Sequence, residues 1–302
     1  MSSSLLTNSA AMTALQTLRN VSSNLQTTEN RISTGQRVAT ASDNAAYWSI
    51  ATSMRADNAA LSAVSDSLGL SAATVDTEYT ALTAVVGDSS GGLTKLQSLL
   101  VEAKTAGIDR TKIQADITQI QQQMKATASA ATFNGVNWLS TTTATPATFD
   151  LVSSFSRVGG TPTIGAITLT IANYSLYTSS QGGILDKVSG GASVDTIDIS
   201  TLTDSAADQT TLTGYITQLT TAINSVASAA ADLGAVKNRI ATNTDFVKTL
   251  MDSVTRGVGQ LVDADMNAES TRLQALQTQQ QLGVQALSIA NQNSQSILSL
   301  FK

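Results

Sequence analysis

The chain contains no cysteine and no histidine, only two prolines, and few aromatic residues. Without Cys and His it can form no disulfide, Ser-His-Asp triad, haem ligation or ordinary zinc site. Aromatic residues make up only 4% of the 302 residues, although Phe, Tyr and Trp normally supply much of the buried area of a globular core. A core of Ala, Leu, Ile and Val instead suits the narrow spaces between helices. These absences argue against the common enzyme classes and favour packed helices.

Charged residues are also scarce, at 13% against a typical ~25%. The net charge of −5 argues against nucleic-acid binding, which needs a basic face. There is no run of 18 apolar residues and no apolar segment after a basic start, so we expect neither membrane insertion nor a cleavable signal peptide. A soluble monomer with so few charges is expected either to carry glycans or to hide much of its surface in an assembly.

Three zones follow one another along the chain. Residues 1–133 and 205–302 are helical in pattern, whereas residues 134–204 are rich in Thr, Ser and Gly and hold both prolines. We expect helices over residues 5–33, 44–106 and 109–131, with a break at Gly87, Gly91 and Gly92. The long helices keep a 3-4 alternation of apolar residues, which is typical of coiled coils. The sequence therefore predicts a mainly α fold: an antiparallel coiled-coil rod of N- and C-terminal helices, with a small β-rich insert in the middle.

Local signals predict the helix ends and the strands. Gly35 should end the first helix, Ser42 or Asp43 should cap the second, and Ser205 with Asp208 forms a capping-box-like start for the C-terminal zone. In the middle zone, the alternation over residues 163–171 predicts a strand, and a second is expected over residues 197–202. The small core of this insert is expected to consist of six aromatic residues: Phe133, Trp138, Phe149, Phe155, Tyr174 and Tyr177.

The two ends of the chain are free of charge. Residues 1–18 and 273–301 contain no Asp, Glu, Lys or Arg, but they carry apolar stripes among Gln, Asn, Ser and Thr. Disorder and simple pairing within one molecule are two interpretations. A third is that these segments are helices that many copies of the chain cover in a polymer, because a solvated helix normally keeps a charged face.

The remaining charged residues do not form an evident catalytic centre. Asp263 and Asp265 stand two apart, so a helix would point them to different faces. Around the loop after the first helix lie Arg31, Arg37 and Asp43. Either these three are solvated charges or they make ion pairs between subunits, and the sequence leaves both interpretations open.

Several ordered motifs resemble those of bacterial flagellins. Residues 31–38 read RISTGQRV and residues 41–46 read ASDNAA, similar to the N-terminal signature of that family. FNGV at 133–136 and LGAVKNR at 233–239 resemble its later rod motifs. The tail is similar as well, with DAD at 263–265, ANQ at 290–292 and LSL at 298–300. The resemblance covers about residues 1–140 and 205–302, and the middle matches no motif.

The resemblance implies a structural subunit of the bacterial flagellar filament, an extracellular polymer built from chains that are exported unfolded. It implies an inner tube made by residues 1–43 and 258–302, a coiled-coil rod made by 44–139 and 205–257, and an outer insert over 140–204. Expected partners are further copies of the chain, other flagellins, an export chaperone, and the cap and hook-junction proteins; no enzymatic activity, cofactor or metal is expected. The residues expected to serve self-assembly are Leu15, Leu18, Leu25, Ile32, Arg31, Arg37, Asp43, Leu276, Leu287, Leu298 and Phe301.

One segment departs from the family pattern. Many flagellins carry Arg-Glu-Leu where this chain has Gln97, Ser98 and Leu99, and an innate immune receptor binds that pattern. Replacing a cation and an anion in a polar contact commonly weakens it, so the resemblance implies poor recognition by the receptor.

Other functions remain as alternatives. A hook–filament junction protein would share the helical ends. A non-flagellar coiled-coil surface scaffold would use the middle zone as a binding head. A hydrolase in the insert is a third class, but the zinc protease known from some flagellins needs His ligands that this chain lacks.

Overall fold

A computed structural model describes residues 8–88, 91–141, 148–158, 161–189 and 191–299, with the backbone alone for 158 and 293–299. The chain divides into two compact units. The terminal unit combines Met1–Ala59 with Met251–Lys302, and the central unit is Ala60–Leu250. Helices α2 (Ala45–Val86) and α5 (Ala206–Val262) contribute to both units, and each unit is described by itself below.

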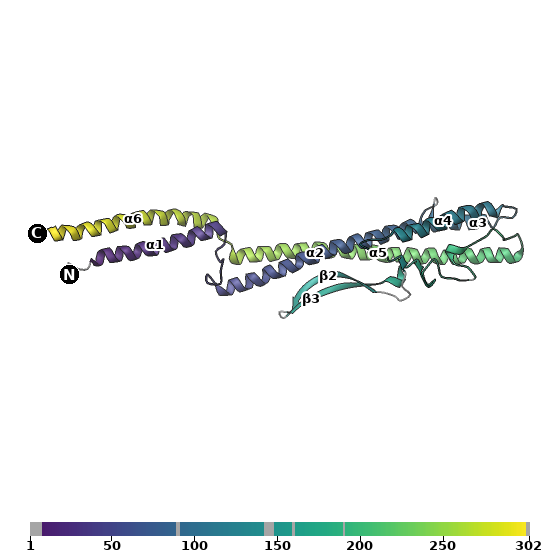
Figure 1. The fold of residues 1–302 in the computed structure, drawn as a ribbon, viewed down its shortest axis with the longest axis horizontal. Coiled ribbons are helices and arrows are strands. Elements are labelled where there is room, and N and C mark those ends of the chain that lie inside the picture. Colours follow the sequence, from purple (N-terminus) through teal and green to yellow (C-terminus); the bar gives the residue numbers. More distant parts are fainter. Residues whose placement is uncertain (1–7, 89–90, 142–147, 159–160, 190, 300–302) are drawn as a thin grey trace. The chain divides into compact units, whose positions relative to one another are not determined.

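The terminal unit pairs the two ends of the chain. Helix α1 (Ser9–Thr34) and helix α6 (Met266–Ser299) lie side by side and run in opposite directions (Figure 1). The Asn8 side chain donates a hydrogen bond to the carbonyl of Ala290 at 3.0 Å, and Arg31 bonds Glu269 at the other end of the pair at 3.1 Å. The predicted antiparallel pairing of terminal helices is therefore present within a single chain.

The ends of α1 follow local sequence signals. Asn8 caps its start by accepting from the backbone N–H of Ala11 at 2.9 Å. Gly35 ends the helix as predicted, with a φ of 70° that favours glycine because it has no Cβ.

The loop between α1 and α2 corrects one prediction. Neither Ser42 nor Asp43 caps α2; Asn44 does, accepting from the backbone N–H of Tyr47 at 3.1 Å. Asp43 instead folds the loop, since its carboxylate accepts from the backbone N–H groups of Ala39 and Thr40 at 3.1 and 2.9 Å. The Asp43 carboxylate bonds backwards to the loop, and the next residue, Asn44, caps the helix instead.

In the central unit, a tight glycine turn separates α2 from α3 (Gly92–Glu102), as the sequence predicts. Gly87 and Gly92 both have positive φ, at 64° and 68°. A Cβ added to Gly87 would collide with the carbonyl of Gly91, so the turn requires glycine there.

Helix α4 (Arg110–Ala130) packs beside α3 and begins where the sequence predicts, with Asp109 as its cap accepting from the N–H of Thr111 at 3.1 Å. The start of α5 is half of a capping box: Ser205 accepts from the N–H of Asp208 at 3.2 Å. The Asp208 carboxylate, however, accepts from the N–H and hydroxyl of Thr203 rather than from Ser205.

The middle zone forms two small sheets. Strands β2 (Thr148–Val158) and β3 (Thr161–Thr170) make an antiparallel hairpin with an irregularity between Val152 and Ser154, and β1 (Ser140–Thr141) pairs with β4 (Tyr177–Thr178) in parallel. Short 3-10 helices cover Ile171–Asn173 (η1) and Val194–Thr196 (η2). The strand at 163–171 is thus confirmed as part of β3.

The prediction of a strand over residues 197–202 was wrong. The backbone there bonds to glutamine side chains of α4: Ile199 N–H donates to Gln114 at 2.9 Å, and the carbonyl of Ile197 accepts from Gln121 at 3.1 Å. Because helix side chains satisfy these backbone groups, the segment needs no neighbouring strand.

Three of the six aromatic residues contact one another, with the Trp138 ring centroid 5.2 Å from that of Phe149 and 6.4 Å from that of Tyr174, but they do not form a separate core in the insert. Trp138, Tyr174 and Tyr177 are buried, whereas Phe133, Phe149 and Phe155 are only half-buried. The buried residues dock onto the long helices: the backbone N–H of Trp138 donates to Glu78 of α2 at 2.9 Å, and the Tyr174 hydroxyl donates to Asp232 of α5. The insert therefore shares its core with the helices of the central unit.

Candidate self-assembly surface of the terminal helices

The terminal unit leaves a band of large apolar side chains uncovered. Met12 on α1 is 60% exposed, and Leu282, Val284 and Ile289 on α6 are 58%, 54% and 62% exposed. Between Arg272 and the end of α6 there is no charged side chain, and none precedes Arg19. We refer to these four residues together with Leu15 as the uncovered stripe. Leu282 and Ile289 share one face of α6, whereas Val284, two residues from Leu282, points to another face. Exposed apolar residues without charged neighbours mark a surface that another molecule covers.

Of the predicted self-assembly residues, several stabilise the α1–α6 pair itself. Leu276 is buried, and Leu18, Leu25, Ile32 and Leu287 are half-buried. Leu18 reaches α6 at Gly283, where an added Cβ would lie 3.1 Å from its methyl carbon. Such residues have their apolar surface largely covered within one chain.

The other predicted apolar residues are placed differently. Leu15 is 38% exposed and belongs to the uncovered stripe. Leu298 lies on α6 where only the backbone is described, and Phe301 lies outside the described residues. The spacing of the apolar residues did not identify Met12, Leu282 and Ile289. It predicts the residues that face the partner helix, whereas these three are exposed beside that face.

A second exposed group lies at the start of α2. Tyr47, Trp48 and Ile50 are all exposed, at 40%, 37% and 49%. The guanidinium of Arg37 lies over the Tyr47 ring, 5.9 Å from its centroid. This group extends the apolar surface of the terminal unit beyond α1 and α6.

The three charged residues around the loop are engaged within the chain. Arg31 pairs with Glu269, and Arg37 donates to the carbonyl of Leu261 at 3.0 Å. Backbone and hydroxyl hydrogen bonds from Thr40 hold the pKa of Asp43 below its ordinary value. Within one chain these residues therefore make contacts that close the loop and join its flanking helices, while Arg37 and Asp43 stay exposed to solvent. Ion pairs between subunits stay a prediction.

The segment that departs from the family pattern lies on α3. Ser98 is exposed and Gln97 is half-buried, with its amide donating to the hydroxyl of Thr220 on α5 at 3.0 Å. Leu99 is only 4% exposed, so it packs inside the central unit and offers no surface to a receptor.

None of the described helices is long and apolar enough to cross a membrane. Among the described residues there is also no group of three or more acidic side chains that could hold a metal ion, in a chain that has no Cys or His.

Two family descriptions match the helical parts of the chain. The bacterial flagellin N-terminal helical region matches residues 5–144, and the bacterial flagellin C-terminal helical region matches residues 216–301. The chain belongs to the bacterial flagellin family. Neither match includes residues 145–215, which contain β2, β3 and the loops that follow.

The sequence is similar to those of curated flagellins over nearly the full length of the chain. The chain is 43% identical to Flagellin C of Rhizobium meliloti (strain 1021) and 44% identical to a flagellin of Brucella melitensis biotype 1, covering 99% of both chains in each case. It is 38% identical to Flagellin A of Rhizobium meliloti (strain 1021), covering 99% of this chain and all of the relative.

Family membership makes this chain a structural subunit that self-polymerises into the extracellular flagellar filament. The predicted mainly α fold, with helices at both ends and a small strand region between them, is confirmed. The flagellin relatives do not favour a junction protein or a non-flagellar scaffold.

Proposed function

We propose that the uncovered stripe supplies subunit contacts of the filament, and that the terminal helices gain their full order as neighbouring copies cover it. The observation that carries this proposal is the combination of strong exposure at Met12, Leu282, Val284 and Ile289 with the absence of charge around them. Burial of such surface favours association without any energy-consuming site, because apolar area leaves water. Coupled folding and binding would keep the chain adaptable before assembly.

The proposal assigns different parts of the chain to different layers of the filament. Residues 1–43 and 258–302 would make the inner tube, and residues 44–139 and 205–257 would make the surrounding coiled-coil layer. Residues 140–204 would lie outermost. The lack of charge in residues 1–18 and 273–301 supports an inner position for these parts of α1 and α6, where copies of the chain would replace water.

We extend the proposal to further partners and to the route of the chain. An export chaperone would bind the uncharged C-terminal segment before export, and the cap and hook-junction proteins would meet the chain at the two ends of the filament. Other flagellins would share the same lattice. No catalytic activity is assigned, because the family is structural.

Substitution of one stripe residue tests the interface. Ile289→Asp places a charge where a polymer would bury it, which costs several kcal/mol if the charge stays unpaired. We expect monomers with unchanged helical circular dichroism but no filaments by electron microscopy and sedimentation, and no swimming in a strain lacking its own flagellin.

A matched control introduces the same charge elsewhere. Thr242→Asp alters an exposed residue of α5 in the central unit and should still form filaments. Deletion of residues 273–302 should leave the central unit folded and abolish filaments. Normal filaments from Ile289→Asp and from the deletion would refute the proposed interface.

A further inference from the structure

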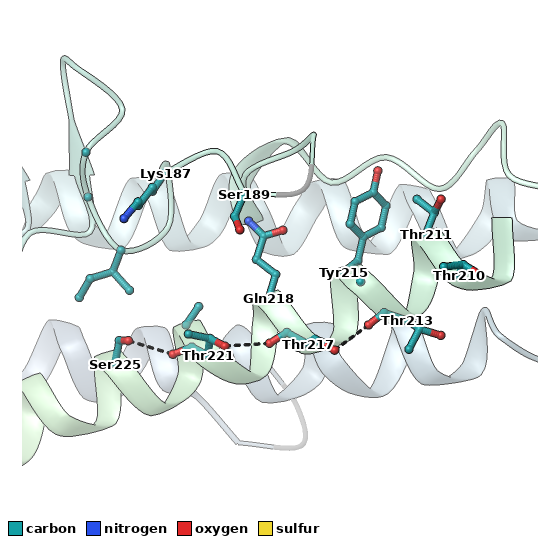
Figure 2. A pocket seen from close by; sticks show the side chains of 15 residues that line it. Lys187, Ser189, Thr210, Thr211, Thr213, Tyr215, Thr217, Gln218, Thr221 and Ser225 are labelled. Atoms are coloured by element: carbon teal, nitrogen blue, oxygen red, sulfur yellow. Dashed lines mark hydrogen bonds between the residues drawn. The ribbon is translucent and has the colours of Figure 1, made fainter. Parts of the chain in front are cut away.

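A groove of about 900 Å³ lies in the central unit, between the loop of residues 182–189 and the first half of α5. Figure 2 shows the side chains that line it, with Lys187 and Ser189 on the loop and a row of hydroxyl residues on the helix. Its size is within the range of small-molecule sites. The lining contains no carboxylate and a single cation, Lys187. The uncovered stripe does not include it, although its helix wall belongs to the segment assigned to the coiled-coil layer.

The threonine and serine hydroxyls on the helix side act as acceptors toward a ligand, whereas the hydroxyl of Tyr215 can also donate. Thr217, Thr221 and Ser225 each donate to the backbone carbonyl four residues earlier in α5, at 2.9, 3.0 and 2.9 Å. These are the dashed bonds of Figure 2, which continue to Thr213. Because each hydroxyl hydrogen is already engaged, the oxygens present lone pairs to the groove.

On the loop side the side-chain donors are the Lys187 ammonium and the Ser189 hydroxyl, and the backbone N–H groups are already used. The backbone N–H of Gly183 donates to Asp186 at 2.6 Å, that of Ile184 to Ser175 at 2.9 Å, and that of Ser189 to Ala192 at 3.0 Å. These bonds fix the loop, and a Cβ on Gly183 would collide with the carbonyl of Leu176. The wall is therefore preformed and its N–H groups are already used.

Gln218 adds a fixed acceptor. Its amide nitrogen donates to the carbonyl of Ala192 at 3.0 Å, which orients the amide, and Figure 2 shows the side chain pointing from α5 toward the loop with Ser189. Its Oε1 is buried and has no hydrogen-bond partner among the described residues. A buried acceptor left without a partner costs about 1–3 kcal/mol, so a donor brought by a ligand would be favoured at this point.

We propose that this groove binds a short neutral saccharide. An acceptor-rich wall needs a ligand rich in donors, and sugar hydroxyls can all donate while their ring faces contact apolar surface. The ring of Tyr215, half-exposed in the groove, provides such a surface. A peptide brings as many carbonyl acceptors as N–H donors, which these walls do not match. A phosphate ligand would need several cations or free N–H groups.

The test measures binding of maltotriose, cellotriose and laminaritriose to the full-length monomer by calorimetry and saturation-transfer NMR. At least one of these glucose trimers is expected to bind the wild-type chain. The double variant Thr217→Val/Thr221→Val keeps side-chain shape and removes two acceptors, and it should weaken that binding about tenfold, which corresponds to about 1.4 kcal/mol.

The matched control is Thr242→Val/Thr249→Val. Both threonines are exposed on α5, both make the same bond to the carbonyl four residues earlier, and neither lines the groove. The control should bind as the wild type does. Failure of all three trimers to bind the wild type, equal weakening in the control, or binding of a peptide of residues 273–299 in the groove instead would overturn the proposal. None of these results bears on filament formation.

Discussion

Glu78 is a buried carboxyl group whose ionisation should weaken the central unit. Its side chain on α2 is fully buried, one oxygen accepts from the backbone N–H of Trp138 at 2.9 Å, and the other has no partner among the described residues. Burial raises the pKa of Glu78 to about 7 from 4.5, although the Trp138 hydrogen bond acts in the opposite direction.

The sign of the effect follows from proton linkage. The folded chain holds the Glu78 proton more tightly than the unfolded chain, so this residue favours folding most at a pH below the unfolded pKa of 4.5. The advantage is lost as the pH rises from there through about 7. A difference of this size in pKa corresponds to about 3 kcal/mol in the free energy of unfolding.

The substitution Glu78→Gln removes the ionisation and keeps an oxygen for the Trp138 N–H. At pH 8 the variant should be more stable than the wild type by up to about 3 kcal/mol, and near pH 4.5 the two should be similar. Urea unfolding of the monomer measures this through the fluorescence of Trp138. Both proteins carry Trp48→Phe, because Trp48 is the only other tryptophan.

The control is Glu102→Gln, which changes an exposed glutamate at the end of α3 and should shift the wild-type curve little at either pH. The difference between the wild type and Glu78→Gln isolates one group from all other titrations. If that difference is the same at pH 4.5 and pH 8, the carboxyl group is not held neutral by burial and the reasoning is refuted.

Three further predictions concern the central unit. Arg110 is buried and bonds the carbonyls of Ala103 and Leu202 and the carboxylate of Asp204; Arg110→Lys should cost about 3 kcal/mol in urea unfolding, whereas Lys112→Ala, in an exposed pair, should cost less than about 1 kcal/mol. Gly87→Ala should destabilise the unit because φ is positive and a carbonyl blocks the Cβ, whereas Gly69→Ala in open space within α2 should stabilise it by roughly 0.5–1 kcal/mol; thermal unfolding distinguishes the two. The wild-type monomer should activate the innate immune receptor weakly in reporter cells, and Gln97→Arg/Ser98→Glu should increase the response; full potency of the wild type would contradict this.

The sequence predicts those parts of the fold that depend on neighbouring residues. Gly35 ends α1, Asp109 caps α4 and the glycines at 87–92 interrupt the long helix because backbone geometry and capping act within a few residues. Even among neighbouring residues, two hydrogen-bonding roles compete for one side chain. The Asp43 carboxylate accepts from the loop, and Asn44 caps α2 instead.

Contacts between distant segments were not predictable in the same way. Nothing near Ile199 indicates that Gln114 will satisfy its backbone, and nothing near Trp138 indicates that Glu78 lies beneath it. For the candidate surface, the absence of charge at the two ends pointed to the helices that carry the uncovered stripe. The alternation of apolar residues then predicted their paired face, but the more exposed residues Leu282 and Ile289 stand beside that face.

The lack of charge at the chain ends has a consequence for the environments in which such a filament persists. Dissolved salt weakens attractions between charged groups. The proposed subunit contacts contain no charged groups, so salt has no attraction to screen there. Changes between dilute and saline water should therefore leave the cohesion of the polymer nearly unchanged, while strongly hydrated anions such as sulfate should strengthen it. Cold has the opposite effect, since attraction between apolar surfaces weakens on cooling.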